Sequence, residues 1–255
     1  MNYLFVTFAA LIGLMIGSFL NCLAWRLYKD DTILGRSYCP KCSKTIAWYD
    51  NIPLLSFAML GGRCRHCKKK ISYQYPLVEF LTAILFALVF LNNVNAPNLA
   101  VLLVRDWLLI STFVLIFIYD LRWQMVPMLI VWPMILVAFV LNLLIGFSWQ
   151  MLVVFGIIGV LFFLIQYLLT KGKGLGEGDI WLGLLIGVSF PELGHFVVSL
   201  FIAYFVGSIV SMCLLLNRQK KWTKGYYYFN LWANDSYLVF KLVIELLNSN
   251  KFCII

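Results

Sequence analysis

The sequence predicts an all-α membrane protein, a polytopic bundle of about seven, or eight, transmembrane helices. Hydrophobic residues make up 63% of its 255 residues and charged residues only 12%, which does not fit a soluble globular domain. Several uninterrupted apolar stretches approach the roughly 20 residues that cross a bilayer as a helix. None alternates with a period of two, as the strands of a membrane β-barrel would.

Seven apolar stretches are expected to cross the membrane. They are Tyr3–Trp25, Pro76–Leu91, Leu99–Tyr119, Pro127–Phe147, Met151–Leu169, the shorter Ile180–Phe190, and Phe196–Leu216. A further segment, Tyr226–Leu247, carries several polar and charged residues, so it predicts an eighth span, an interfacial helix or a divergent tail. We therefore expect an N-terminal domain over residues 3–91, a membrane domain over residues 99–216 and a divergent tail over residues 217–255.

The basic residues predict the orientation of the chain. Ten of the twenty Lys and Arg residues lie between the first two expected spans, nine of them in a loop of about residues 28–75. Loops with such an excess face the cytosol, so the N-terminus is expected outside. This bias and the attraction of anionic lipid account for the net charge of +9. The expected partner is therefore the lipid bilayer, and no nucleic acid is required.

Two lone acids are the candidate catalytic residues. Asp120 follows the third expected span and Asp179 precedes the short one, so the charge-derived orientation places both at the cytosolic leaflet. Acids within membrane segments are costly and mark functional sites. Two facing carboxylates cannot both ionise easily and form a combined general acid and base, the chemistry of an aspartic protease. The alternative is that Asp179 caps a helix beginning at Ile180 and Asp120 is a polar stop.

The residues before Asp179 are rich in glycine. Gly176 and Gly178 flank Glu177, and glycine permits close backbone approach or positive φ before a helix. We therefore expect this loop to admit an extended substrate. It lacks the Gly-Lys-Ser/Thr ending of a phosphate-binding loop, and no serine-nucleophile or HExxH pattern competes for the catalytic role.

Four cysteines in the basic loop form two CxxC knuckles. These are Cys39, Cys42, Cys64 and Cys67. Four thiolates at this spacing predict a tetrahedral structural zinc site, and a cytosolic location disfavours stable disulfides. Redox-active or unliganded cysteines are the alternative.

Three separated blocks match one family in order. The first is Gly17-Ser18-Phe19-Leu20-Asn21, with Arg26 downstream. The second is the double CxxC, with Trp48–Pro53 between the knuckles and Tyr73–Glu79 after them. The third joins Asp120 and Pro127 to Gly176–Asp179. With these blocks the chain resembles the type IV prepilin peptidases, or leader peptidases, of the GxGD aspartic protease family, and its glycine motif resembles the competence-type branch of Gram-positive bacteria.

The resemblance implies a peptidase of the bacterial plasma membrane with Asp120 and Asp179 as its catalytic pair. Its substrates would be prepilin or competence pseudopilin precursors, whose short basic leader stays in the cytosol. Many members also methylate the new N-terminus with S-adenosylmethionine, an activity associated with the N-terminal half. Glu79 could then bind the new amino group, and Asn21 and Arg26 could guide the leader. The structural alternatives are a cationic partner for Glu79 and helix neighbours for the other two.

One departure and two other function classes stay open. Met128 stands where the family commonly has Asp or Asn after Pro127, so a polar contact near Asp120 is absent. A proton-coupled transporter would also place acids in spans, although in repeated halves that this sequence lacks. A non-catalytic, zinc-stabilised assembly factor would keep the cysteines without needing both aspartates.

Overall fold

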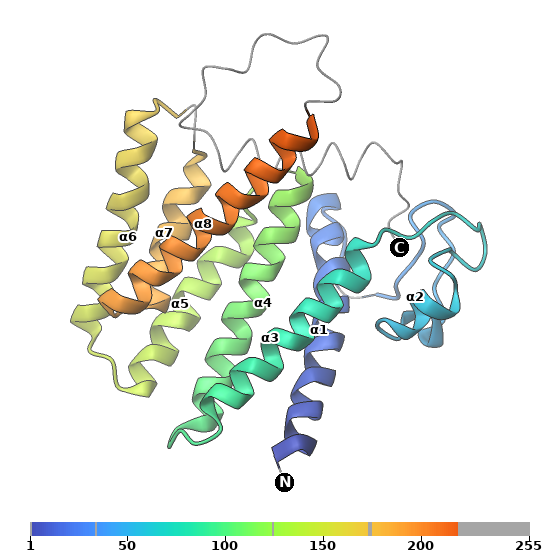
Figure 1. Cartoon of the computed structure of the whole chain (residues 1–255), viewed down its shortest axis with the longest axis horizontal. Coiled ribbons are helices and arrows are strands. Elements are labelled where there is room, and N and C mark those ends of the chain that lie inside the picture. The colour runs from blue at the N-terminus through green and yellow to red at the C-terminus, as the bar shows by residue number, and fades with distance from the viewer. Residues whose placement is uncertain (1, 34, 124, 173–174, 219–255) are drawn as a thin grey trace. The chain divides into compact units, whose positions relative to one another are not determined.

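All the named elements are helices in the residues that the computed structural model describes, which are 2–33, 35–123, 125–172 and 175–218 (Figure 1). The helices are α1 Asn2–Lys29, the 3-10 helix η1 Trp48–Asn51, α2 Leu55–Met59, α3 Gln74–Asn93, α4 Leu99–Trp123, α5 Met128–Ile145, α6 Trp149–Leu169, α7 Glu177–Ser189 and α8 Leu193–Arg218. Extended pairing within this part of the chain is limited to two isolated β-bridges. The predicted all-α fold is confirmed.

Five of these helices, α1, α3, α4, α5 and α6, are long and apolar enough to cross a membrane. The protein is thus a multi-pass membrane protein, but the expected count of seven spans is not confirmed. Helix α7 has 13 residues and a length of about 20 Å, less than the hydrocarbon thickness. The proposed eighth span, Tyr226–Leu247, and nearly all of the predicted tail domain lie outside the described residues.

The chain divides into two compact units between Ile118 and Tyr119. In the first unit, α1 and α3 run side by side because small residues of α1 meet the backbone of α3. A Cβ added at Gly17 would lie 2.8 Å from the Cα of Glu79, so only glycine permits this approach. The packing brings Ser18 and Glu79 together.

In the second unit, α7 packs along α5 and α6. A Cβ at Gly183 would lie 2.8 Å from the carbonyl carbon of Gly159 on α6. On the α5 side, the buried Asn142 donates from Nδ2 to the carbonyl of Val188 at 2.8 Å. These contacts fix the position of α7 and therefore the position of Asp179 in its first turn.

Candidate active site and metal centre

Asp120 and Asp179 lie in the second unit at the ends of two helices. Asp120 is in the last turn of α4 and Asp179 is in the first turn of α7. Both side chains are half-buried, and the two carboxyl groups are close enough for their charges to interact. Tertiary folding thus brings together the two acids that the sequence singled out.

The local role of Asp179 differs from the helix cap considered above. Helix α7 begins at Glu177 rather than Ile180, so Gly176 is the N-cap and Asp179 is the third helical residue. The Asp179 Oδ2 accepts a hydrogen bond from the Gly176 amide at 3.0 Å, and the Asp179 amide donates to the Gly176 carbonyl at 3.1 Å. This reciprocal pair satisfies orphan backbone groups and orients the carboxylate. Because it engages one oxygen, capping does not exclude a catalytic role.

Gly178 lets the segment after α4 approach the start of α7. A Cβ at Gly178 would lie 2.9 Å from Val126 Cβ and 3.2 Å from Met128 Cε. Met128, the departure noted in the sequence, therefore presents an apolar methyl group beside the glycine motif. The contribution of Val126 was not foreseen.

Two polar side chains near Asp179 were also missed by sequence reasoning. The Tyr204 hydroxyl, on α8, donates to Gln166 Oε1, on α6, at 2.8 Å. Tyr204 also lies within electrostatic range of Asp179. The available signal was that each residue interrupts an apolar run, but sequence did not show that the two runs meet.

The four knuckle cysteines converge in the first unit. Their Sγ atoms all lie within 4.8 Å of one another, and those of Cys39 and Cys67 are 3.9 Å apart. A tetrahedral zinc with Zn–S bonds of about 2.3 Å requires sulfur separations of about 3.8 Å, whereas a disulfide requires about 2.05 Å. The predicted cluster is confirmed as a group that could hold a metal ion.

The two knuckles share one backbone pattern. The Cys39 amide donates to the Lys44 carbonyl at 3.0 Å, and the Cys64 amide donates to the Lys69 carbonyl at 2.9 Å. Burial raises the pKa of the Cys39 thiol to about 12. A bound cation would offset this cost by stabilising the thiolate, so the donor set fits a metal better than four free thiols.

An ion pair ties the second knuckle to η1. Arg65, between the two cysteines of this knuckle, donates from Nε and Nη2 to the two carboxylate oxygens of Asp50 at 2.7 and 2.6 Å. These hydrogen bonds hold the pKa of Asp50 below its usual range. The guanidinium also lies 5.5 Å from the centre of the Tyr49 ring.

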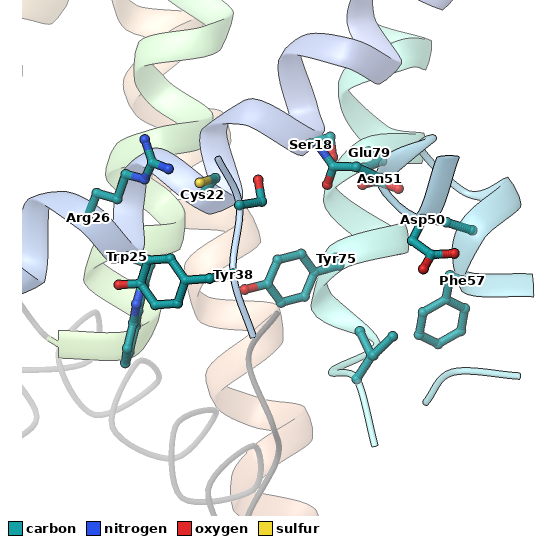
Figure 2. A pocket seen from close by; sticks show the side chains of 13 residues that line it. Ser18, Cys22, Trp25, Arg26, Tyr38, Asp50, Asn51, Phe57, Tyr75 and Glu79 are labelled. Atoms are coloured by element: carbon teal, nitrogen blue, oxygen red, sulfur yellow. The ribbon is translucent and has the colours of Figure 1, made fainter. Parts of the chain in front are cut away.

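A polar pocket of about 60 Å³ lies between the knuckle loop and the helices α1 and α3 (Figure 2). Ser18, Asn51 and Glu79 gather at one end of it, and Trp25 and Tyr38 lie at the other. The buried carboxylate of Glu79 accepts a hydrogen bond from the Leu54 amide at 2.8 Å and another from the Ser18 hydroxyl. Two neutral donors, rather than a cation, hold this acid.

Arg26 and Asn21 serve neighbouring structure. The buried Arg26 guanidinium donates to the carbonyls of Gly35 at 2.9 Å and Arg36 at 3.3 Å, which holds the chain after α1. Asn21 donates to the Gly17 carbonyl at 3.1 Å and accepts from Gln74 Nε2 at 3.3 Å. These contacts favour the structural interpretation of both residues, although Arg26 also lines the pocket.

Comparison of the sequence with known proteins identifies the family of this chain. The bacterial peptidase A24 N-terminal domain matches residues 11–93, and the type IV leader peptidase family matches residues 107–212. A prepilin leader peptidase/N-methyltransferase from Vibrio cholerae is 33% identical over 226 residues, covering 80% of this chain and 86% of that protein. Enzymes of the same name from Aeromonas salmonicida and Neisseria gonorrhoeae are 32% and 27% identical, covering 87% and 86% of this chain and 85% and 86% of those proteins. No solved structure matches the chain. The chain belongs to the type IV leader peptidase family.

Proposed function

We propose that this protein is a membrane aspartic endopeptidase that removes the leader of prepilin-like precursors, with Asp120 and Asp179 as its catalytic carboxylates. The observation that carries the proposal is the convergence of these two half-buried acids, from helices far apart in sequence, to within electrostatic range. The names of the relatives supply the substrate class.

The reaction follows from one proton shared by the pair. The ionised carboxylate removes a proton from water as the water oxygen attacks the peptide carbonyl carbon, while the protonated carboxyl donates its proton to the carbonyl oxygen. The tetrahedral intermediate then collapses. Its C–N bond breaks as the carboxyl group that took the water proton donates that proton to the leaving amine, while the other carboxylate removes a proton from one hydroxyl of the intermediate. A carboxylic acid and an amine are released, and the pair again shares one proton. The Gly176 amide holds Asp179 in position during these steps.

The test is cleavage of a purified prepilin in detergent by the full-length protein. Asp120→Asn and Asp179→Asn should each lower the rate by roughly 10²-fold or more, because each removes one proton-transfer group. Glu177→Gln is the matched control, since Glu177 is an exposed acid of the same glycine motif. Undiminished cleavage by either Asp variant would exclude the carboxylate pair as the catalytic machinery.

We further propose that Cys39, Cys42, Cys64 and Cys67 bind a structural zinc ion. Isolated protein should contain about one zinc per chain. Cys42→Ser and Cys67→Ser should each lower the bound zinc severalfold, whereas Cys22→Ser, a cysteine of α1 outside the cluster, should not. Zinc content well below one equivalent in the unmodified protein would contradict the assignment.

Methylation of the new N-terminus is a second candidate activity, favoured by the relatives' names. The pocket beside Glu79 offers a carboxylate for an amino group. Its volume of about 60 Å³ is far below the roughly 300–1,000 Å³ of small-molecule sites, so it does not fit S-adenosylmethionine. A radiolabelled-methyl assay on cleaved pilin, with Glu79→Gln beside Glu177→Gln, tests the activity. Running type IV prepilins and competence pseudopilins in parallel tests the predicted branch.

A further inference from the structure

The loop between α1 and α3 exposes an apolar face. Leu55 and Met59, one turn apart on the same face of α2, are 61% and 81% exposed. Trp48 of η1 is 75% exposed, and Tyr73, immediately before α3, is 73% exposed. We define these four residues as the apolar face of the loop. All four lie on the loop that joins α1 to α3, and large exposed apolar side chains, aromatic ones above all, favour the membrane interface when they lie between two spanning helices.

The other side of α2 is anchored. Ser56 and Phe57 line the polar pocket, and the Phe57 ring packs so closely on Gly62 that a Cβ added there would lie 3.1 Å from it. The helix is therefore held by one side while Leu55 and Met59 point away from the pocket. A fixed orientation means that the exposed face presents a defined surface rather than a transient one.

The charge around this face is strongly basic. Six basic residues of the same loop are exposed, and they lie before or after Trp48, Leu55 and Met59 in the sequence: Lys41, Lys44, Arg63, Lys68, Lys69 and Lys70. Asp50 is the one acid from Cys39 to Tyr73, and Arg65 neutralises it. Such a surface is complementary to an anionic one.

The loop is also tethered close to the bilayer. It leaves α1 at Lys29 and enters α3 at Gln74, and both helices are long and apolar enough to span a membrane. The loop therefore begins and ends where two spanning helices leave the hydrocarbon, beside the headgroup layer.

We infer that the loop binds the headgroup layer of an anionic bilayer, with Trp48, Leu55, Met59 and Tyr73 inserted among the lipids and the lysines on their phosphates. Apolar burial combined with basic attraction to anionic lipid is the physics of an interfacial amphipathic surface. Aromatic rings such as Trp48 and Tyr73 favour this layer. The loop, its cysteine cluster and its pocket are then held against the membrane.

The experiment measures the depth of Trp48 in the full-length protein in nanodiscs that hold one copy each. The emission of Trp48 is obtained by subtracting the spectrum of Trp48→Phe. Brominated phosphatidylcholine containing phosphatidylglycerol should quench this emission at least about twofold, and the quenching should weaken without phosphatidylglycerol or at high salt.

Two variants separate insertion from charge. Met59→Asp should reduce the quenching, whereas Ile33→Asp, a 48% exposed apolar site elsewhere in the loop, should not. Changing Lys68, Lys69 and Lys70 together to Gln should remove the dependence on phosphatidylglycerol. Bound zinc verifies that each variant is folded.

The inference would be overturned if brominated lipid left the emission of Trp48 unchanged while acrylamide in the aqueous phase quenched it. The apolar face would then be a surface for a protein partner. Shielding of Trp48 only in discs that hold two copies would also overturn the inference, in favour of a contact between copies of the chain.

Discussion

At the residue scale, the glycine motif works through close packing as well as through backbone freedom. Gly178 is met by Val126, which leaves no space for a methyl group between the start of α7 and the segment after α4. The start of α7 carries Asp179, and the segment with Val126 follows the helix end that carries Asp120. The distance between the two carboxylates therefore depends on Gly178, which takes no part in the reaction itself.

Gly178→Ala should therefore lower the cleavage rate. The added Cβ would lie 2.9 Å from Val126, and overpacking of this kind costs about 1–3 kcal/mol. Val126→Ala in the same chain should recover part of the loss, since it removes Cγ2, one of the two Val126 atoms that an added Cβ would meet at 2.9 Å. Measuring cleavage and thermal unfolding for the two single variants and the double variant checks this coupling, and additive losses would contradict it.

The Asp50–Arg65 pair predicts a pH dependence of the knuckle loop. The pKa of Asp50 is lowered in the folded protein by its hydrogen bonds to Arg65. Its contribution to stability is thus complete above the unfolded pKa of about 3.9 and is lost as pH falls through the lower folded value. Hydrogen exchange of η1 should be faster in Arg65→Gln than in the unmodified protein at neutral pH, and the two should converge in acid. A difference that persists in acid would count against the pair.

At the scale of elements, α7 is short, and its contacts with α5 and α6 hold it in place. Its 13 residues are few for a spanning helix, and its position depends on glycine contacts with α6. Sequence predicted the helix but set its start three residues late, because the capping bond between Gly176 and Asp179 extends the helix toward its N-terminus. A pattern of apolar residues does not report this bond.

Gly183→Ala should destabilise the protein more than Gly194→Ala. A Cβ at Gly183 would lie 2.6 Å from the Phe163 ring and 2.8 Å from the carbonyl carbon of Gly159, whereas nothing lies within 4 Å of a Cβ at Gly194. The first substitution should cost about 1–3 kcal/mol, and the second should be neutral or slightly stabilising in its helix. Thermal unfolding in detergent compares the two, and equal midpoints would refute the packing account.

At the scale of the whole molecule, the distribution of basic residues predicts the membrane orientation. The knuckle loop carries most of the basic charge that precedes α3, while the connector between α3 and α4 carries none. A reporter active only in the cytosol should work when inserted at Lys44 and fail when inserted at Asn95 or Ser148. Activity of the Asn95 fusion would reverse the orientation.

Sequence by itself determined the class of this protein, since long apolar stretches admit no other fold class than membrane helices. It also determined the chemistry available, because the cysteine spacing predicts a metal cluster and the two lone aspartates predict an acid pair. These signals are local in the chain, and a few residues suffice to carry them.

Tertiary structure alone decided what surrounds those groups. Tyr204 and Gln166 meet near Asp179 because α6 and α8 bring them there, and Val126 meets Gly178 for a similar reason. Asn21 and Arg26, which are candidates for substrate contact, also form hydrogen bonds with other parts of the polypeptide. Contacts between distant segments depend on the packing of side chains, which neither hydrophobic periodicity nor charge counting encodes.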